Sequence, residues 1–266
     1  MKKFELTSEF VTFLGKTLFR IKALVSFGDV AEGELGGFIE RENNLDQSGD
    51  AWVSGDAQVF GNARVCGNAQ VCGDAQVSGD AWVSGDAQVY GDAQVCGDAQ
   101  VSGDAQVFGN ARVCGDAQVS GDAWVSGDAQ VFGNARVCGN AQVYGDAQVC
   151  GNARVYGDAQ VFGNARVCGD AQVSGDAQVF GNARVCGDAW VQNCRDYSAT
   201  SCFGSENRTT TFFRTKDGGI SVRCGCFYGT LREFREKVKE RHGDSRLAKE
   251  YLMLADLMEF RLSKDE

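Results

Sequence analysis

Apolar and polar positions repeat with a period of six from Ser48 to Val191, where x-Gly-[Asp/Asn]-Ala-x-Val runs through 24 hexapeptides without a break. Ala and Val are two residues apart, so in an extended segment their side chains point to the same side. Because this side is always apolar, we expect it to form an interior, while the residues flanking Val point outward. Gly and the following Asp or Asn predict a corner, since Gly adopts positive φ and Asp or Asn bond locally.

A repeat this short buries its apolar side only by stacking on its neighbours. The spacing of an aliphatic residue followed four positions later by a small one, as in Val53 and Ala57, resembles the hexapeptide-repeat family. The resemblance implies an all-β solenoid in which three hexapeptides form one triangular coil of a left-handed parallel β-helix. Twenty-four hexapeptides would give about eight coils, a rod of about 38 Å at about 4.8 Å per layer.

The ends of such a rod expose unpaired backbone groups, so both need covers. We expect residues 1–47 to form an N-terminal β cap, 48–191 the β-helix, and 192–266 a small C-terminal α+β domain. In the N-terminal cap, the segments 11–14 and 17–25 predict a hairpin. An irregular first coil is expected over 28–45, and its inward residues are predicted to be Val30, Leu35, Ile39 and Leu45.

The C-terminal region carries hairpin and helix signals. Segments 209–215 and 220–227 flank a Lys-Asp-Gly-Gly turn, and Thr230 to Glu233 form a capping box followed by an amphipathic helix that stops at Gly243. A second amphipathic helix follows. It could pack on the cap or on another subunit, and we interpret its apolar stripe as an oligomerisation surface, made of Leu247, Tyr251, Leu254 and Met258.

The charge lies mainly in the repeats, whose 16 Asp and 6 Arg equal the net charge of −10 for the whole chain. This disfavours direct nucleic-acid binding by the rod. No secretory signal and no run of 18 apolar residues is visible. Eight of the 12 Cys occupy one repeated outward slot where Ser, Phe and Tyr also occur, which favours reduced thiols and a cytoplasmic location.

Catalysis is disfavoured by the pattern of the repeats. Many hexapeptide-repeat proteins are acyltransferases, and these resemble one another in using a His near a loop that interrupts the coils. Here the single His, His242, lies outside the repeats, and no loop interrupts them. Zinc is a weak alternative, because a Cys-x-Cys with a distant pair is a poor signal; its ligands would be Cys194, Cys202, Cys224 and Cys226. We expect no cofactor and no enzymatic activity.

Residues 18 apart should fall in one column, which assigns the outward side chains to three faces. One face is the most aromatic, and we interpret it as a partner or oligomer interface. Its outward aromatic residues are Trp52, Tyr90, Phe108, Trp124, Tyr144, Phe162 and Phe180. The alternative is that stacked rings merely stabilise neighbouring layers.

Corner Asp residues form acidic ladders along the edges of the predicted rod. The members we single out are Asp86, Asp92, Asp98, Asp104, Asp116, Asp122 and Asp128. One interpretation is that Asp and Asn serve corner geometry and solubility alone. The other is a rigid anionic rod that imitates duplex DNA and occupies a DNA-binding protein.

The flanks add a second resemblance. The opening stretch from Gly15, with Phe27-Gly-Asp-Val and Leu35-Gly-Gly-Phe-Ile-Glu, looks like the start of hexapeptide-repeat proteins of bacteriophages and prophages. The stretch beginning Cys224-Gly-Cys-Phe-Tyr-Gly resembles the domain that closes them. Members are often labelled transferase-like or polymer-forming, on the repeat alone.

This resemblance implies action inside a bacterial host. We therefore expect a non-catalytic phage protein that inhibits or sequesters a host protein, such as a defence or DNA-acting enzyme, and that forms homo-oligomers. The alternatives are a self-associating structural protein and an acyltransferase-like or small-nucleotide-binding protein.

Overall fold

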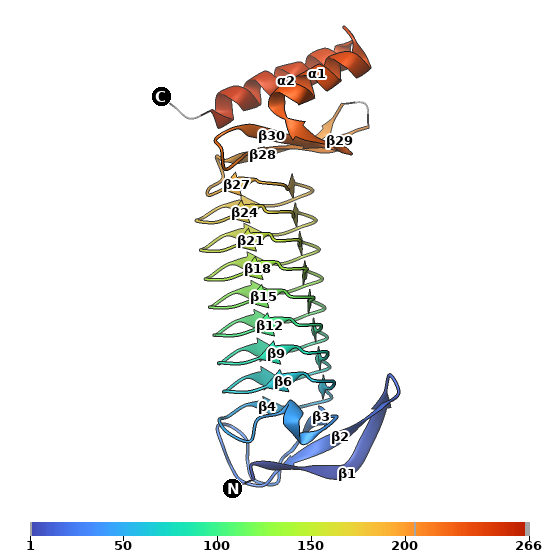
Figure 1. The fold of residues 1–266 in the computed structure, drawn as a ribbon, viewed down its shortest axis with the longest axis vertical. Helices are drawn as coiled ribbons and strands as arrows, with labels where there is room; N and C mark the ends of the chain where they lie inside the picture. The colour runs from blue at the N-terminus through green and yellow to red at the C-terminus, as the bar shows by residue number, and fades with distance from the viewer. Residues whose placement is uncertain (1, 205, 264–266) are drawn as a thin grey trace.

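The computed structural model describes residues 2–204 and 206–263 and shows a straight rod with a cap at each end (Figure 1). Three parallel sheets run along the rod, each with eight strands from the repeats. Strands 18 residues apart pair in register, as in Gln88 with Gln106. The all-β solenoid of eight regular coils is therefore confirmed, and its hand stays a prediction.

The two-residue strands alternate among three faces. The aromatic face contains β4 (Trp52–Val53), β7 (Gln70–Val71), β10 (Gln88–Val89), β13 (Gln106–Val107), β16 (Trp124–Val125), β19 (Gln142–Val143), β22 (Gln160–Val161) and β25 (Gln178–Val179). The cysteine face contains β5 (Gln58–Val59), β8 (Gln76–Val77), β11 (Gln94–Val95), β14 (Arg112–Cys114), β17 (Gln130–Phe132), β20 (Gln148–Val149), β23 (Arg166–Val167) and β26 (Arg184–Val185). The third face contains β6 (Arg64–Val65), β9 (Trp82–Val83), β12 (Gln100–Val101), β15 (Gln118–Val119), β18 (Arg136–Val137), β21 (Arg154–Val155), β24 (Gln172–Val173) and β27 (Trp190–Val191).

The interior is the predicted one, since the repeated Ala and Val side chains are buried throughout the rod. Each layer bonds the next through the backbone; for example, the amides of Asp86 and Gln88 donate to the carbonyls of Gly103 and Ala105, both at 2.9 Å. The corner positions require glycine for two reasons, a positive φ and a close approach between layers. Gly103 has a φ of +70°, and a Cβ there would lie 2.9 Å from the amide nitrogen of Gly121 in the next layer.

The N-terminal cap is built from β1 (Phe4–Phe13), β2 (Lys16–Ala23), β3 (Leu35–Ile39) and the 3-10 helix η1 (Glu42–Asn44). The predicted hairpin is present, and β3 joins it to the cysteine-face sheet by pairing with β5. Val30, Ile39 and Leu45 are buried as predicted. Leu35 was wrongly placed inside: it is 53% exposed, because β3 meets the rod only from Gly36 onward.

Polar side chains of this cap bond backbone groups of the first coil that have no layer beneath them. The buried Lys3 ammonium donates to the carbonyls of Gly49 (3.2 Å) and Ala51 (2.9 Å). Asn44 donates in the same way to the carbonyls of Gly61 and Ala63, at 3.1 and 2.8 Å. Four backbone carbonyls at the rod end thus have donors from the cap, as buried backbone groups require.

The C-terminal cap is a four-stranded antiparallel sheet covered by two helices: β28 (Tyr197–Phe203), β29 (Arg208–Arg214), β30 (Ile220–Cys224), β31 (Phe227–Thr230), α1 (Leu231–His242) and α2 (Arg246–Leu262). The hairpin and the capping box are confirmed. Thr211 accepts from the amide of Arg184 (2.9 Å), and Asp196 accepts from the amide of Gln192 (2.8 Å), which ties the sheet to the last coil.

The interpretation of this apolar stripe of the second helix as an oligomerisation surface was wrong. Tyr251, Leu254 and Met258 are buried in the core of the cap, among Phe212, Phe234 and the α1 side chains, and Leu247 is half-buried at the start of the same stripe. The cap sheet supplies a face large enough to cover this stripe. No helix among the described residues is long and apolar enough to span a membrane.

Candidate binding surfaces

Most of the predicted aromatic residues form two stacked columns along one side of the rod. Tyr90 lies parallel to Phe108 with ring centroids 4.8 Å apart, and Phe108 meets Trp124 edge-on at 6.1 Å. Further along, Phe162 stacks on Tyr144 at 5.0 Å and on Phe180 at 5.4 Å. Trp124 and Phe180 remain 44% and 50% exposed, whereas the other four rings are half-buried by their neighbours. Stacking between layers explains part of the arrangement of these rings. The exposed rings of Trp124 and Phe180 remain accessible to a binding partner.

Trp52 does not belong to this exposed face, which corrects the prediction. It is only 2% exposed because the N-terminal cap covers it, with the Phe27 ring edge-on at 5.4 Å. A Cβ on Gly36 would lie 2.7 Å from the Trp52 ring, so glycine is needed there for the close approach. Trp52 is therefore part of the junction between the cap and the rod.

The predicted corner residues Asp86, Asp92, Asp98, Asp104, Asp116, Asp122 and Asp128 are all exposed. Of the repeat aspartates, in the part of the chain that the structure describes, only Asp56 forms an ion pair, with Arg20 at 3.5 Å. Corner asparagines act as donors within the ladders: the Asn68 amide reaches Asp86 at 2.9 Å, and Asn110 reaches Asp128 at 3.0 Å. The ladders thus present carboxylates to solvent with few cations among them.

The four cysteines of the C-terminal region do not gather at one point. Cys194, Cys202 and Cys226 are exposed and Cys224 is half-buried, where its sulfur accepts a hydrogen bond from Thr210 at 3.2 Å. Within residues 2–204 and 206–263, no group of three His, Cys, Asp or Glu is arranged to hold a metal ion. The described structure therefore gives no support for a zinc site at these four cysteines.

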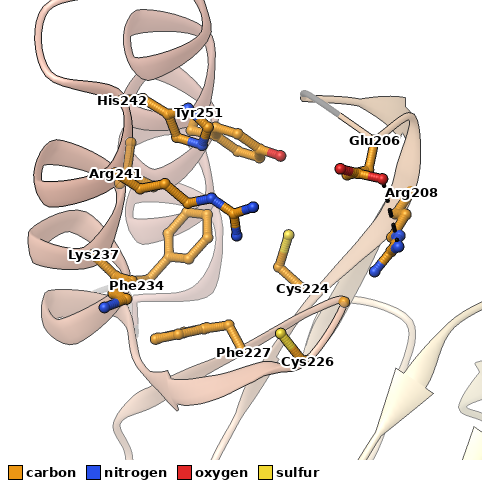
Figure 2. A pocket seen from close by; sticks show the side chains of 12 residues that line it. Glu206, Arg208, Cys224, Cys226, Phe227, Phe234, Lys237, Arg241, His242 and Tyr251 are labelled. Carbon is orange, nitrogen blue, oxygen red and sulfur yellow. Dashed lines mark hydrogen bonds and ion pairs between the residues drawn. The ribbon is translucent and has the colours of Figure 1, made fainter.

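A pocket of about 420 Å³ opens between α1 and the edge of the cap sheet (Figure 2). Lys237, Arg241 and His242 line its helix side, while Cys224 and Cys226 come from the sheet. His242 lies against the ring of Tyr251, with centroids 5.7 Å apart. The single histidine is thus part of the cap, at the end of α1.

An exposed apolar stripe, absent from the predictions made from the sequence, lies on the outer side of α2. Met253, Leu257 and Phe260 are 70%, 57% and 84% exposed. Their spacing of four and three residues places them on one side of the helix. This spacing is visible in the sequence as a second stripe, offset from the stripe that the cap buries.

The comparisons with known proteins concern the rod. Nine segments match the family model described as YdcK Beta solenoid repeat, at residues 57–73, 69–85, 75–91, 105–119, 117–131, 129–145, 147–161, 159–175 and 177–193. Each segment is close in length to one coil, and all lie within or directly beside the rod. No curated protein matches the chain. The rod of this chain is therefore similar to the YdcK β-solenoid repeat.

Proposed function

We propose that this chain is a non-catalytic binding protein whose rod occupies the nucleic-acid-binding surface of another protein. The resemblance of the flanks to phage proteins makes a host bacterial protein, such as a defence or DNA-acting enzyme, the expected partner. The observation that carries the proposal is an acidic segment in the middle of the rod, from Asp74 to Asp128. There Asp fills nine of ten successive corners, and Asn110 is the exception.

The charge density of the acidic segment is close to that of duplex DNA. Ten corners span just over three coils, so nine carboxylates at about 4.8 Å per layer give one charge per about 1.8 Å of rod. Duplex DNA carries one charge per about 1.7 Å of its axis. Arg112 is the only basic residue of the segment, so little of this charge is neutralised.

The ladder is also held in place before any partner arrives. The strand amides of the segment, such as that of Gln100, donate to the next layer at 2.9 Å, and the corner amides of Asp80 and Asp86 do so at 2.8 and 2.9 Å. The layers that carry the corners are therefore held at a fixed spacing. A surface already in its bound form loses little entropy on association. Complementary charge also raises the rate of encounter with a basic partner.

Equal changes of net charge inside and outside the acidic segment test the proposal. One variant replaces Asp86, Asp98, Asp104 and Asp116 with Asn; the matched control replaces Asp146, Asp158, Asp170 and Asp176. Asn already fills eight corners, so both variants should fold. Each protein is used as bait in nuclease-treated bacterial lysate, and a short DNA duplex is then added.

We expect the unmodified rod and the control to retain a partner that the duplex displaces, and the first variant to lose it. Capture should also weaken as salt rises, since charge dominates it. A partner that the duplex leaves in place, or that both variants hold equally well, would contradict the proposal.

A second candidate function is self-association, and it rests on the outer stripe of α2 formed by Met253, Leu257 and Phe260. Such a stripe at the end of a rod suits a second copy of the chain, packed through the same helix. Leu257→Glu with Phe260→Glu should then reduce the mass in solution measured by light scattering. Lys239→Glu, on the exposed side of α1, is the control. A mass equal to one chain before any substitution would exclude this candidate.

A further inference from the structure

Three cysteines form a ladder on the cysteine face near its junction with the C-terminal cap. Cys150, Cys168 and Cys186 follow β20, β23 and β26, which pair in register. Cys150 and Cys186 are 9% and 8% exposed, and Cys168 between them is more open. Adjacent strands lie about 4.8 Å apart, within the roughly 4.4–6.8 Å of Cα separation that a disulfide spans.

The upper two thiols line a pocket of about 300 Å³ whose other walls are basic. Arg166 and Arg184 come from the rod, Arg223 comes from β30 of the cap, and Tyr228 closes the side next to Gly187. A Cβ on Gly187 would overlap the Tyr228 hydroxyl, so this glycine allows the cap to approach.

The guanidiniums of this pocket are not neutralised by the protein. In the described part of the chain, Arg166, Arg184 and Arg223 form no side-chain hydrogen bond and no ion pair. The corner residues before the two rod arginines are Asn164 and Asn182, which carry no charge. Three unpaired guanidiniums around one opening favour an anionic ligand, carboxylate or phosphate above all.

We propose that Cys168 is a reactive thiol for small disulfides that carry carboxylates, and that Cys186 resolves the product into a Cys168–Cys186 disulfide. The arginines bind the carboxylates and place the disulfide over Cys168. The Cys168 thiolate attacks one sulfur, the S–S bond of the small disulfide breaks, and one thiolate leaves and is protonated by water. Cys186, after losing its proton to water, then attacks the Cys168 sulfur and releases the second thiolate. The protein is oxidised by two electrons and the small disulfide is reduced to two thiols.

The surroundings of Cys168 favour its thiolate, which is the nucleophile in such exchange. Hydrogen bonds from the Cys150 and Cys186 thiols lower the pKa of Cys168, and the Arg166 and Arg223 guanidiniums act in the same direction. Donating to Cys168 raises the pKa of Cys150 and Cys186, and their burial adds to this. The middle of the ladder is thus the position that ionises first.

The test compares an anionic with a neutral disulfide on the reduced full-length protein. The probes are 5,5′-dithiobis(2-nitrobenzoate) and 4,4′-dithiodipyridine, and the modified sites are located by mass spectrometry after trypsin digestion. The peptide 167–184 contains Cys168 as its single cysteine. Cys114, which stacks on Cys96 on the same face but lies far from the cap, is the internal reference.

We expect Cys168 to react about tenfold faster than Cys114 with the anionic probe, and this advantage to shrink with the neutral probe. Arg223→Gln should reduce the advantage severalfold, whereas Arg154→Gln, on the third face of the rod, should leave it unchanged. Cys186→Ser should stop the reaction at the mixed disulfide, whereas Cys150→Ser, on the side of Cys168 away from the pocket, should not. Ser already occupies this slot in other repeats, so the fold is kept. Equal rates at Cys168 and Cys114, or insensitivity to Arg223→Gln, would overturn the proposal.

Discussion

In the rod, the strand amides of each layer donate to carbonyls of the next layer, and this pattern of bonds repeats from coil to coil. At the two ends no further layer exists, and single polar side chains take its place: Lys3 and Asn44 at the N-terminal end, Thr211 and Asp196 at the C-terminal end. The rod therefore spreads its stability over many equivalent contacts, whereas each cap concentrates it in a few side chains. Substitutions in the two regions should differ in size and in how far their effects spread.

The largest effect is expected where two layers approach most closely. Gly103→Ala meets both a φ of +70° and the backbone of Gly121, while Gly181→Ala, in the last coil, has a φ of +65° but no atom within 4 Å of the new Cβ. Backbone strain costs about 1–3 kcal/mol at either site, and the clash adds about 1–3 kcal/mol at Gly103 alone. Urea unfolding of both variants measures this difference. Equal shifts would mean that the close approach contributes nothing.

A smaller and more local effect is expected from Lys3→Met. The substitution keeps the buried stem and leaves the carbonyls of Gly49 and Ala51 without their donor, at about 1–3 kcal/mol for each unsatisfied group. Hydrogen exchange should accelerate in the first coil and stay unchanged in the middle of the rod. Lys2→Met, which removes only the exposed ion pair with Glu42, is the control. Faster exchange along the whole rod would contradict a purely local role of the cap.

The stability of the N-terminal cap should also depend on pH, through the ionisation of Glu40. Hydrogen bonds from Lys16 and from the Gly61 amide lower the pKa of Glu40 below 4.5. A carboxyl with a lowered pKa in the folded state contributes stability that is fully present above its unfolded pKa and is lost as the pH falls through the folded pKa. Measured relative to the intrinsic exchange rate at each pH, exchange in the first coil should therefore accelerate below pH 4.5 in the native chain. Glu40→Gln should show little of this acceleration, and an unchanged pH profile would contradict the assignment.

Repetition explains why the rod could be predicted and the caps only in part. The period of six fixes which residues face inward, so the sheets and the columns of Phe162 and Asp104 follow from counting. Trp52 was misplaced because Phe27 and Gly36 of the N-terminal cap cover it, and Leu35 was misplaced because β3 meets the rod only from Gly36 onward. No period describes either contact. The pocket around Cys168 escaped prediction for the same reason, since Arg223 reaches it from the cap. The α2 stripes show the remaining ambiguity: periodicity finds an apolar side but does not say what covers it.

The smallest effect is expected on the aromatic face, where outward slots accept Ser, Cys, Phe or Tyr. Phe162→Ser removes stacking with Tyr144 and Phe180, at about 0.5–1.5 kcal/mol for each pair, whereas Phe180→Ser removes one such pair. Urea unfolding should give the Phe162 variant the larger loss, and both should stay below the loss for Gly103→Ala. Phe162→Asp then separates stacking from an interface: if the face binds a partner or a second copy, this charge abolishes the binding. If both binding and oligomeric state survive Phe162→Asp, the rings serve only to stack neighbouring layers, and the exposed function of the rod lies on its acidic corners.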